Sequence, residues 1–289
     1  MVRRHVLTVI VAGSIIASAT AAQDTRVHVS VADSRNRPVT KLTAADFAVS
    51  IDDRPQEIVS VAPASEPVSV VILTDRLGLE PAYGPPDVHR GLAAFVKTVR
   101  GANPDSKFAL TTFDGPVVRV STFATPTADF DRLIGRLNTV APDGALLDAL
   151  TDACKMLADA PTGRRAIFVL FAAYRPETSN ATVERVGEML RLSEASLWAL
   201  EVRTTAGQNS FGNANRELVV DRGSRLTGGM RDIVASAVGI ESSARRMAEL
   251  IASQYVVTYR PGGGGANSVR KIGVKGSGLR VYAPSWLAR

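Results

Sequence analysis

The residue with the most informative chemical context is Asp75, which follows an apolar run that begins at Val68. The carboxyl ends of parallel strands meet at one edge of a sheet, and ligands usually bind there. A carboxylate at that edge can help to hold Mg²⁺ or can accept backbone N–H groups of the following turn. Phosphoryl transfer usually needs a second carboxylate nearby, but Leu77 stands two residues further on. Asp114 and Asp143 are the other carboxylates that could join Asp75.

Other catalytic and metal-binding classes find little support. The sequence has three histidines and one cysteine, which excludes a Cys/His zinc site and any internal disulfide. We expect His28 on the outward face of a strand and His89 near the start of a helix, both at the surface. Cys154 lies on the apolar stripe of a predicted helix, which indicates a buried and unreactive thiol. The sequence has no Gly-x-Ser-x-Gly elbow, Walker loop or dinucleotide fingerprint.

Composition favours a folded domain with a basic surface. The chain has 289 residues, 45% of them hydrophobic and 21% charged, with a formal net charge of +6. Its basic residues are scattered and do not alternate with aromatic residues. Nucleic acid is therefore not the expected partner, and the basic surface is interpreted as solvated.

The first 22 residues have the three-part pattern of a secretory signal peptide. Arg3 and Arg4 precede an apolar run over residues 6–16, and small residues follow it. The run is shorter than the roughly 20 residues that a membrane-spanning helix needs, so we prefer cleavage to a retained anchor. No later segment is long and apolar enough to span a bilayer, so the mature protein is expected to be secreted or periplasmic.

Residues 67–254 alternate between strands and helices. Continuous apolar runs at 68–73, 166–172 and 197–202 indicate strands covered on both faces, and amphipathic segments lie between them. This order predicts an α/β domain with a mainly parallel sheet and helices on both faces. The further elements that we expect are strands at 107–113, 117–123 and 232–235, and helices at 86–100, 127–137, 145–158, 183–192, 217–226 and 242–252.

Both ends of the mature chain are predicted to be β-structure. Residues 23–66 contain strands at 26–31, 47–51 and 57–61, and residues 255–289 contain strands at 255–259, 269–274 and 279–282. Thr43 is expected to cap a single helical turn before the second strand. An isolated hairpin is only marginally stable in water. We therefore expect the two sets of strands to complete one small β domain, with the α/β domain inserted between its halves.

The order of these segments resembles the von Willebrand factor type A superfamily, in particular the VWFA-related proteins of acidobacteria. The resemblance covers nearly all of the mature chain. It rests on the opening Asp33–Phe47, the turn Asp52–Gln56, the Thr-Gly-Gly within Leu226–Gly229, and Leu250–Pro261. It implies a Rossmann-like type A domain together with the small β domain.

The same resemblance implies a metal-ion-dependent adhesion site, and most of its ligands are missing here. In the superfamily the first strand ends in Asp-x-Ser-x-Ser, and a distant threonine and a second aspartate complete a Mg²⁺ site that accepts a partner's carboxylate. Asp75 matches the first aspartate, whereas Leu77 and Leu79 replace the serines, Gly144 the threonine and Ala173 the second aspartate. We therefore expect no metal cofactor, with Asp75 in a local structural role. Weak Mg²⁺ binding by Asp75 with Asp143 or Asp114 is the alternative.

The sequence predicts a secreted or periplasmic, non-enzymatic module that binds another protein through one edge of the sheet. The identity of that protein and the oligomeric state stay open. One alternative is a scaffold subunit of an envelope assembly. The other is an enzyme of the export compartment with a carboxylate site at Asp75, Asp114 or Asp143. The candidate interaction residues are Asp75, Arg76, Leu77, Leu79, Asp143, Tyr174 and Arg175.

Overall fold

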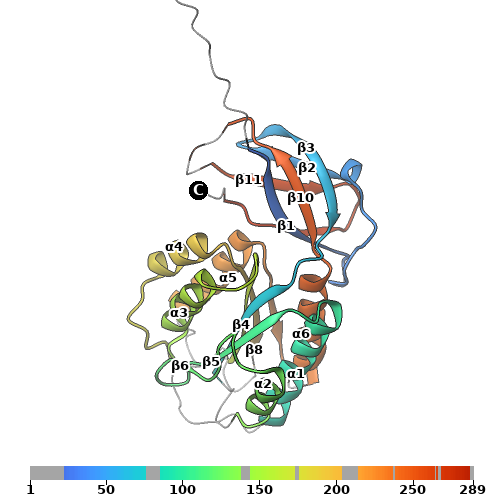
Figure 1. Cartoon of the computed structure of the whole chain (residues 1–289). Coiled ribbons are helices and arrows are strands. Elements are labelled where there is room, and N and C mark those ends of the chain that lie inside the picture. The colour runs from blue at the N-terminus through green and yellow to red at the C-terminus, as the bar shows by residue number, and fades with distance from the viewer. Residues whose placement is uncertain are drawn as a thin grey trace, which may run out of the picture.

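The computed structural model describes residues 23–75, 85–137, 144–172, 176–203, 214–236, 238–263, 265 and 268–286. Two six-stranded sheets form two units that lie one above the other (Figure 1). The upper unit is all β, and the lower unit has helices on both faces of its sheet. The predicted signal peptide lies outside the described residues.

The sheet of the lower unit is mainly parallel, as predicted. Its strand order is β6-β5-β4-β7-β8-β9. All neighbouring pairs are parallel except β5 and β6, which are antiparallel. The strands are β4 (Val68–Thr74), β5 (Lys107–Thr112), β6 (Val118–Arg119), β7 (Arg164–Ala172), β8 (Ser196–Val202) and β9 (Arg231–Val234).

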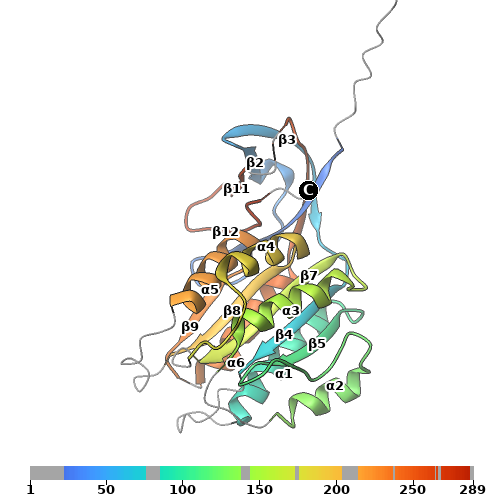
Figure 2. The same cartoon turned by 90° about the vertical axis from the view of Figure 1, so that its left-hand side faces the viewer.

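Helices cover both faces of this sheet (Figure 2). The helices α1 (Pro85–Ala102), α2 (Thr127–Ile134) and α6 (Val238–Ala252) pack on one face, and α3 (Leu146–Ala158), α4 (Val183–Ser193) and α5 (Ala214–Thr227) on the other. Because side chains alternate along a strand, Ile72 of β4 packs toward α1 and Leu73 toward α3. This arrangement explains why the central strands read as continuous apolar runs, and it confirms the predicted α/β class.

The second strand of the β5–β6 hairpin is shorter than predicted. Only Val118 and Arg119 pair with β5, instead of residues 117–123. Beyond them, the backbone N–H groups of Val120 and Ser121 both donate to the carbonyl of Leu110. The Ser121 hydroxyl in turn accepts from the Leu110 N–H. This side chain replaces the next backbone bond of the ladder, so the strand ends there.

Strands from both ends of the chain form the upper unit, which confirms the predicted small β domain. All its pairs are antiparallel, in the order β11-β2-β3-β10-β1-β12. A single 3₁₀ turn, η1 (Ala44–Asp46), is closed by the capping box of Thr43 and Asp46. The strands are β1 (Thr25–Ala32), β2 (Phe47–Ile51), β3 (Arg54–Pro63), β10 (Tyr255–Arg260), β11 (Arg270–Val274) and β12 (Arg280–Tyr282).

The chain passes between the two units at two places that lie side by side. β3 leads into the lower unit and β10 leads out of it, and the two strands pair with Pro63 opposite Tyr255. Buried Arg164, at the start of β7, donates to the carbonyls of Glu66 and Ile251. It also donates to Oε1 of Gln254, 3.0 Å away. One guanidinium therefore holds both crossing segments against the sheet of the lower unit.

The Thr-Gly-Gly segment joins the units at a third place. Gly228 has φ +74, and a Cβ there would lie 2.5 Å from the carbonyl carbon of Ala283. A Cβ on Gly229 would lie 1.9 Å from the carbonyl oxygen of Leu197 in β8. Ser285 N–H donates to the carbonyl of Leu226 across this contact, at 3.0 Å. Only glycine permits the C-terminal segment and β8 to approach this turn so closely.

The lone cysteine is buried, as predicted, and burial raises the pKa of the Cys154 thiol to about 11. Such a thiol carries little thiolate at neutral pH and is therefore a poor nucleophile. Among the described residues, no helix has the length and apolarity required to cross a membrane.

Deleting residues 271–289 is expected to destabilise β1, more than 200 residues away in sequence. The deletion removes β12, which pairs with Ser30–Ala32, and most of β11, which pairs with β2. We expect amides of residues 26–31 to lose hydrogen-exchange protection, most strongly at the β12-paired end. Amides of β4 serve as the control because both neighbouring strands are retained. Unchanged protection in β1 would show that the terminal segments are stabilised independently.

Candidate functional site at the carboxyl edge of the parallel sheet

Asp75 lies at the carboxyl edge of the sheet, directly after β4, and its side chain is fully buried. Its Oδ2 accepts a hydrogen bond from the N–H of Ala172, at the end of neighbouring β7, at 2.9 Å. The carboxylate therefore ties the ends of two central strands together. Because it is 0% exposed, this candidate interaction residue does not itself reach solvent. The following turn, which was predicted to supply N–H groups, lies outside the described residues.

Gly144 is a junction of backbone contacts at the same edge. Its N–H donates to the carbonyl of Pro176 at 3.1 Å, and its own carbonyl accepts from the N–H of Thr178 at 3.0 Å. The segment also bridges to Asp114, which follows β5 and is buried. A Cβ at Gly144 would lie 3.1 Å from the carbonyl oxygen of Phe113 and 3.2 Å from Nη2 of Arg216. The position of the superfamily's threonine is therefore already closely packed.

Arg216, to which no pattern in the sequence points, brings a buried positive charge to this edge. Its Nε donates to Oε2 of Glu177 at 2.9 Å, and the two side chains are 2% and 4% exposed. Its Nη1 lies 3.4 Å from the carbonyl oxygen of Ala172, and its Nη2 lies 3.3 Å from those of Gly144 and Pro176. A rigid fork of five N–H donors suits such a ring of oxygens. Arg216 thus joins α5 to the end of β7 and to the segment before α3.

Glu177, the partner of Arg216, holds two further segments. Its Oε1 accepts from the N–H of Leu147, in the first turn of α3, and from the N–H of Ser179. No local pattern signals the pair in the sequence, because the two residues are 39 positions apart and Glu177 lies between two elements. Only the fold brings them together.

Two positions of the implied Mg²⁺ site, Asp75 and Gly144, already make hydrogen bonds within the protein. The ion needs near-octahedral oxygen coordination. Gly144 offers no side-chain oxygen, its carbonyl already faces a guanidinium, and Asp75 accepts from Ala172. Within the described ranges, no group of three or more His, Cys, Asp or Glu residues is placed to hold a metal. The other candidates at this edge lie outside the described residues, namely Arg76, Leu77, Leu79, Asp143, Ala173, Tyr174 and Arg175.

His28, which was predicted at the surface, is half-buried. The outward face of β1 packs on the lower unit, where the next residue on that face, Ser30, donates to the carbonyl of Leu250. The Nε2 atom of His28 is buried and has no hydrogen-bond partner among the described residues. Burial, and then the positive charge of Arg164, lower the pKa of His28 to about 4. His89 is half-buried, and its Nε2 lies 3.0 Å from the carbonyl oxygen of Leu137.

Removing one partner of the Arg216–Glu177 pair is expected to destabilise the fold strongly. Arg216→Met leaves the Glu177 carboxylate buried without its cation, and such losses typically cost about 3–5 kcal/mol. The double variant Arg216→Met/Glu177→Leu leaves no buried charge, so it should lose less stability than the single variant. Urea unfolding of the single and double variants measures the difference. An equal or larger loss in the double variant would mean that charge pairing is not what Arg216 contributes.

Stability should fall as pH decreases from about 6.5 to 4 because of His28. In this range the unfolded chain binds a proton at His28 that the folded chain does not, while above pH 6.5 both forms are neutral. Each unit of pKa difference is worth about 1.4 kcal/mol. Over this pH range, the free energy of unfolding of His28→Gln should therefore fall by up to about 3 kcal/mol less than that of the wild type. The charged groups that face His28, namely Arg26, Glu66 and Arg164, are common to both proteins. If the stabilities of the wild type and His28→Gln fall in parallel with pH, His28 is not the group that causes the loss.

No family model matches the chain, and no curated protein matches it in sequence. Among solved structures it is similar to proximal thread matrix protein 1 (PTMP1) from the mussel byssus, with a TM-score of 0.51 and 12% identity over 74% of this chain and 50% of that one. PTMP1 with a zinc-occupied MIDAS motif gives a TM-score of 0.51 and 13% identity over 69% and 50%. A von Willebrand factor type A protein from Catenulispora acidiphila gives 0.46 and 11% over 92% and 75%.

The aligned part spans about half the length of PTMP1, and at these identities the likeness concerns the fold alone. The MIDAS motif of PTMP1 is the metal-ion-dependent adhesion site of type A domains. In this chain the corresponding sheet edge carries Asp75, Gly144 and the buried Arg216. The parallel sheet with helices on both faces, in the order β6-β5-β4-β7-β8-β9, therefore has the von Willebrand factor type A fold.

Proposed function

We propose that this chain is a non-enzymatic protein-interaction module of the adhesion type, which binds its partner at the carboxyl edge of the sheet without a bridging metal. The observation that carries the proposal is the buried Arg216–Glu177 pair at this edge. It places a permanent positive charge beside the carbonyls of Gly144 and Ala172. These carbonyls already face the guanidinium, so they are not free to coordinate a divalent ion.

The edge is a suitable place for recognition because several connecting segments begin or end there. Residues 76–84, 138–143, 173–175 and 204–213 link elements whose ends Asp75, Gly144 and Arg216 hold in place. Binding residues are often carried on loops that a rigid framework positions. Tyr174 and Arg175 lie in one of these segments, and an aromatic residue and an arginine are the types most enriched at binding hot spots.

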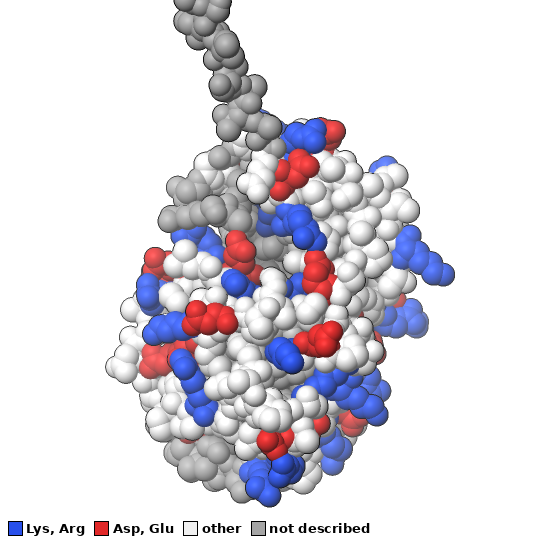
Figure 3. All heavy atoms as spheres, in the orientation of Figure 1, with Lys and Arg blue, Asp and Glu red and all other residues white. Residues whose placement is uncertain are grey.

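A protein partner is preferred to nucleic acid. On the face seen in Figure 3, acidic and basic side chains are interspersed over both units. Many of the basic side chains are also paired with carboxylates, as in Arg119 with Asp152 and Arg260 with Glu57. Nucleic-acid binding usually needs a continuous basic stripe. PTMP1, which shares the fold, is described as a matrix protein of the byssus.

The enzyme alternative finds no specific support among the described residues. Asp75 and Asp114 are both buried, and Asp143 lies outside the described ranges. The scaffold alternative differs from a transient interaction only in the lifetime of the complex. Co-purification from the native host separates these two modes of binding.

A photo-crosslinking residue in place of Tyr174 or Arg175 is expected to capture a discrete protein adduct in the native host. Lys107, which is exposed at the start of β5 and therefore at the opposite edge of the sheet, is the matched control position. The adduct should form in the presence of EDTA, because no metal bridge is needed, and should be absent with the control. Loss of the adduct in EDTA would contradict metal-free binding. Equal capture at position 107 would contradict binding at the edge.

Export to the periplasm or the medium is part of the proposal. The support is the basic, apolar and small-residue pattern of residues 1–22. Intact-mass analysis of protein from the native host should give a mature chain that begins near Ala22, Gln23 or Asp24. A chain that retains Met1 would instead indicate an uncleaved anchor.

A further inference from the structure

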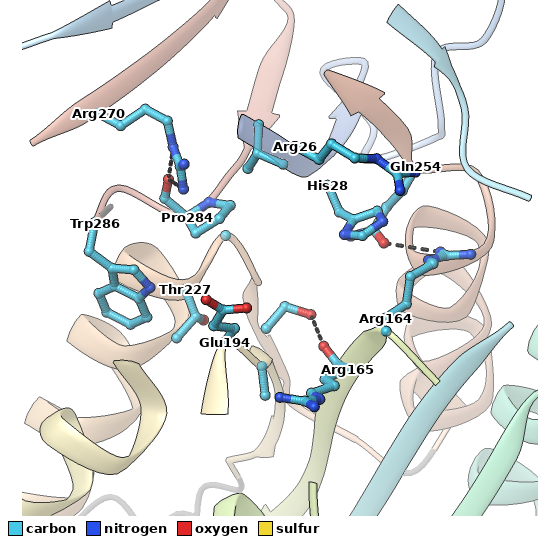
Figure 4. A pocket seen from close by; sticks show the side chains of 15 residues that line it. Arg26, His28, Arg164, Arg165, Glu194, Thr227, Gln254, Arg270, Pro284 and Trp286 are labelled. Atoms are coloured by element: carbon cyan, nitrogen blue, oxygen red, sulfur yellow. Dashed lines mark hydrogen bonds between the residues drawn. The ribbon is translucent and has the colours of Figure 1, made fainter. Parts of the chain in front are cut away.

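A cavity of about 140 Å³ lies between the two units, at the amino edge of the parallel sheet. The lower unit contributes Arg164 and Arg165 from the start of β7, and the upper unit contributes His28 from β1 and Arg270 from β11. Figure 4 shows side chains from both units around this space, with the C-terminal Pro284 and Trp286 on one side. This edge is opposite to the one that holds Asp75 and Arg216.

The residues that line the cavity include four arginines, Arg26, Arg164, Arg165 and Arg270, and one carboxylate, Glu194. Among the described residues, no carboxylate lies within 4.0 Å of the guanidinium nitrogens of Arg164, Arg165 or Arg270. These side chains donate to carbonyl, amide and hydroxyl oxygens, as Arg270 does to Pro284 and Tyr259. Burial lowers the pKa of Arg164 to about 10, so its guanidinium is still a cation at neutral pH.

Three buried nitrogens on cavity-lining residues have no hydrogen-bond partner. They are Nε of Arg164, Nε of Arg165 and Nε2 of His28. A buried donor without a partner typically costs about 1–3 kcal/mol, and native structures contain few of them. Of the five such side-chain atoms in the described residues, these three belong to residues that line one cavity. Their concentration points to a ligand that accepts hydrogen bonds.

We propose that this cavity binds a small free oxyanion, such as phosphate, sulfate or a short carboxylate. Such a ligand supplies acceptor oxygens and negative charge to a lining in which, among the described residues, four arginines stand against the single carboxylate of Glu194. A buried water needs only about 10–15 Å³ of such space, so the cavity has room for a ligand of several heavy atoms. Because both units supply lining residues, a bound oxyanion would also fasten the upper unit to the lower one.

Titration calorimetry and thermal unfolding of the full mature chain test the proposal with inorganic phosphate, sulfate and acetate at constant ionic strength, and chloride as the reference. We expect saturable binding near one site per chain and a rise in Tm with at least one oxyanion. Binding of phosphate or sulfate would identify the ligand as a tetrahedral oxyanion, and binding of acetate would identify it as a planar carboxylate. Equal effects of all anions and chloride would overturn the proposal, because they would show only screening of charge.

Arg165→Met and Arg132→Met are matched variants. Each removes one arginine charge and keeps the side-chain stem, but only Arg165 lines the cavity. The Arg165→Met substitution leaves Arg164 and its hydrogen bonds to the two crossing segments intact, so this variant is expected to fold. We expect Arg165→Met to raise the dissociation constant for the oxyanion at least tenfold and Arg132→Met to leave it unchanged. Equal losses in the two variants would overturn the proposal. If Arg165→Met fails to fold, His28→Gln provides the second variant, with the same expected weakening.

Discussion

The pairing of β3 with β10, and the Arg164 guanidinium below it, is the constraint on which the architecture depends. The type A unit is inserted between strands that must pair with each other, so its two ends have to lie side by side. Pro63 faces Tyr255 in the upper sheet, and Arg164 binds the Glu66 and Ile251 carbonyls just below. The strand β7 that carries Arg164 is also a central strand of the lower sheet. The core of one unit therefore sets the position of the other.

Two buried arginines have comparable roles at opposite edges of the same sheet. Arg164 at the amino edge organises carbonyls of the crossing segments, and Arg216 at the carboxyl edge organises those of Gly144, Ala172 and Pro176. They differ in their counter-charge. Arg216 has a buried carboxylate partner in Glu177, whereas Arg164 has none within salt-bridge distance among the described residues. A buried charge is tolerated when it is paired and hydrogen-bonded. The carboxyl edge is thus internally neutralised, and the amino edge retains positive charge.

This difference gives the two edges different properties. At the carboxyl edge the charges cancel within the protein, and Asp75 and Gly144 are committed to holding strand and helix ends. In the proposed binding mode, the connecting segments at this edge carry the residues that contact the partner. At the amino edge the cavity lies between the units, with donors that the fold does not satisfy. A ligand in this cavity would act on the junction itself, because β1 and β7 both contribute to its walls.

The sequence by itself determined the elements whose patterns are local. Apolar runs of six and seven residues predicted β4 and β7, helical spacing predicted α1 and α3, and the marginal stability of isolated hairpins predicted that the termini share one sheet. The missing ligands at Leu77, Leu79, Gly144 and Ala173 could also be read directly, because each is a residue type at a known place in a motif. Only the tertiary structure decided that Arg216 meets Glu177 and that the outward face of β1 is covered, which leaves Nε2 of His28 buried. These contacts join segments far apart in sequence through side chains with no periodic pattern, so their partners depend on how the sheets pack.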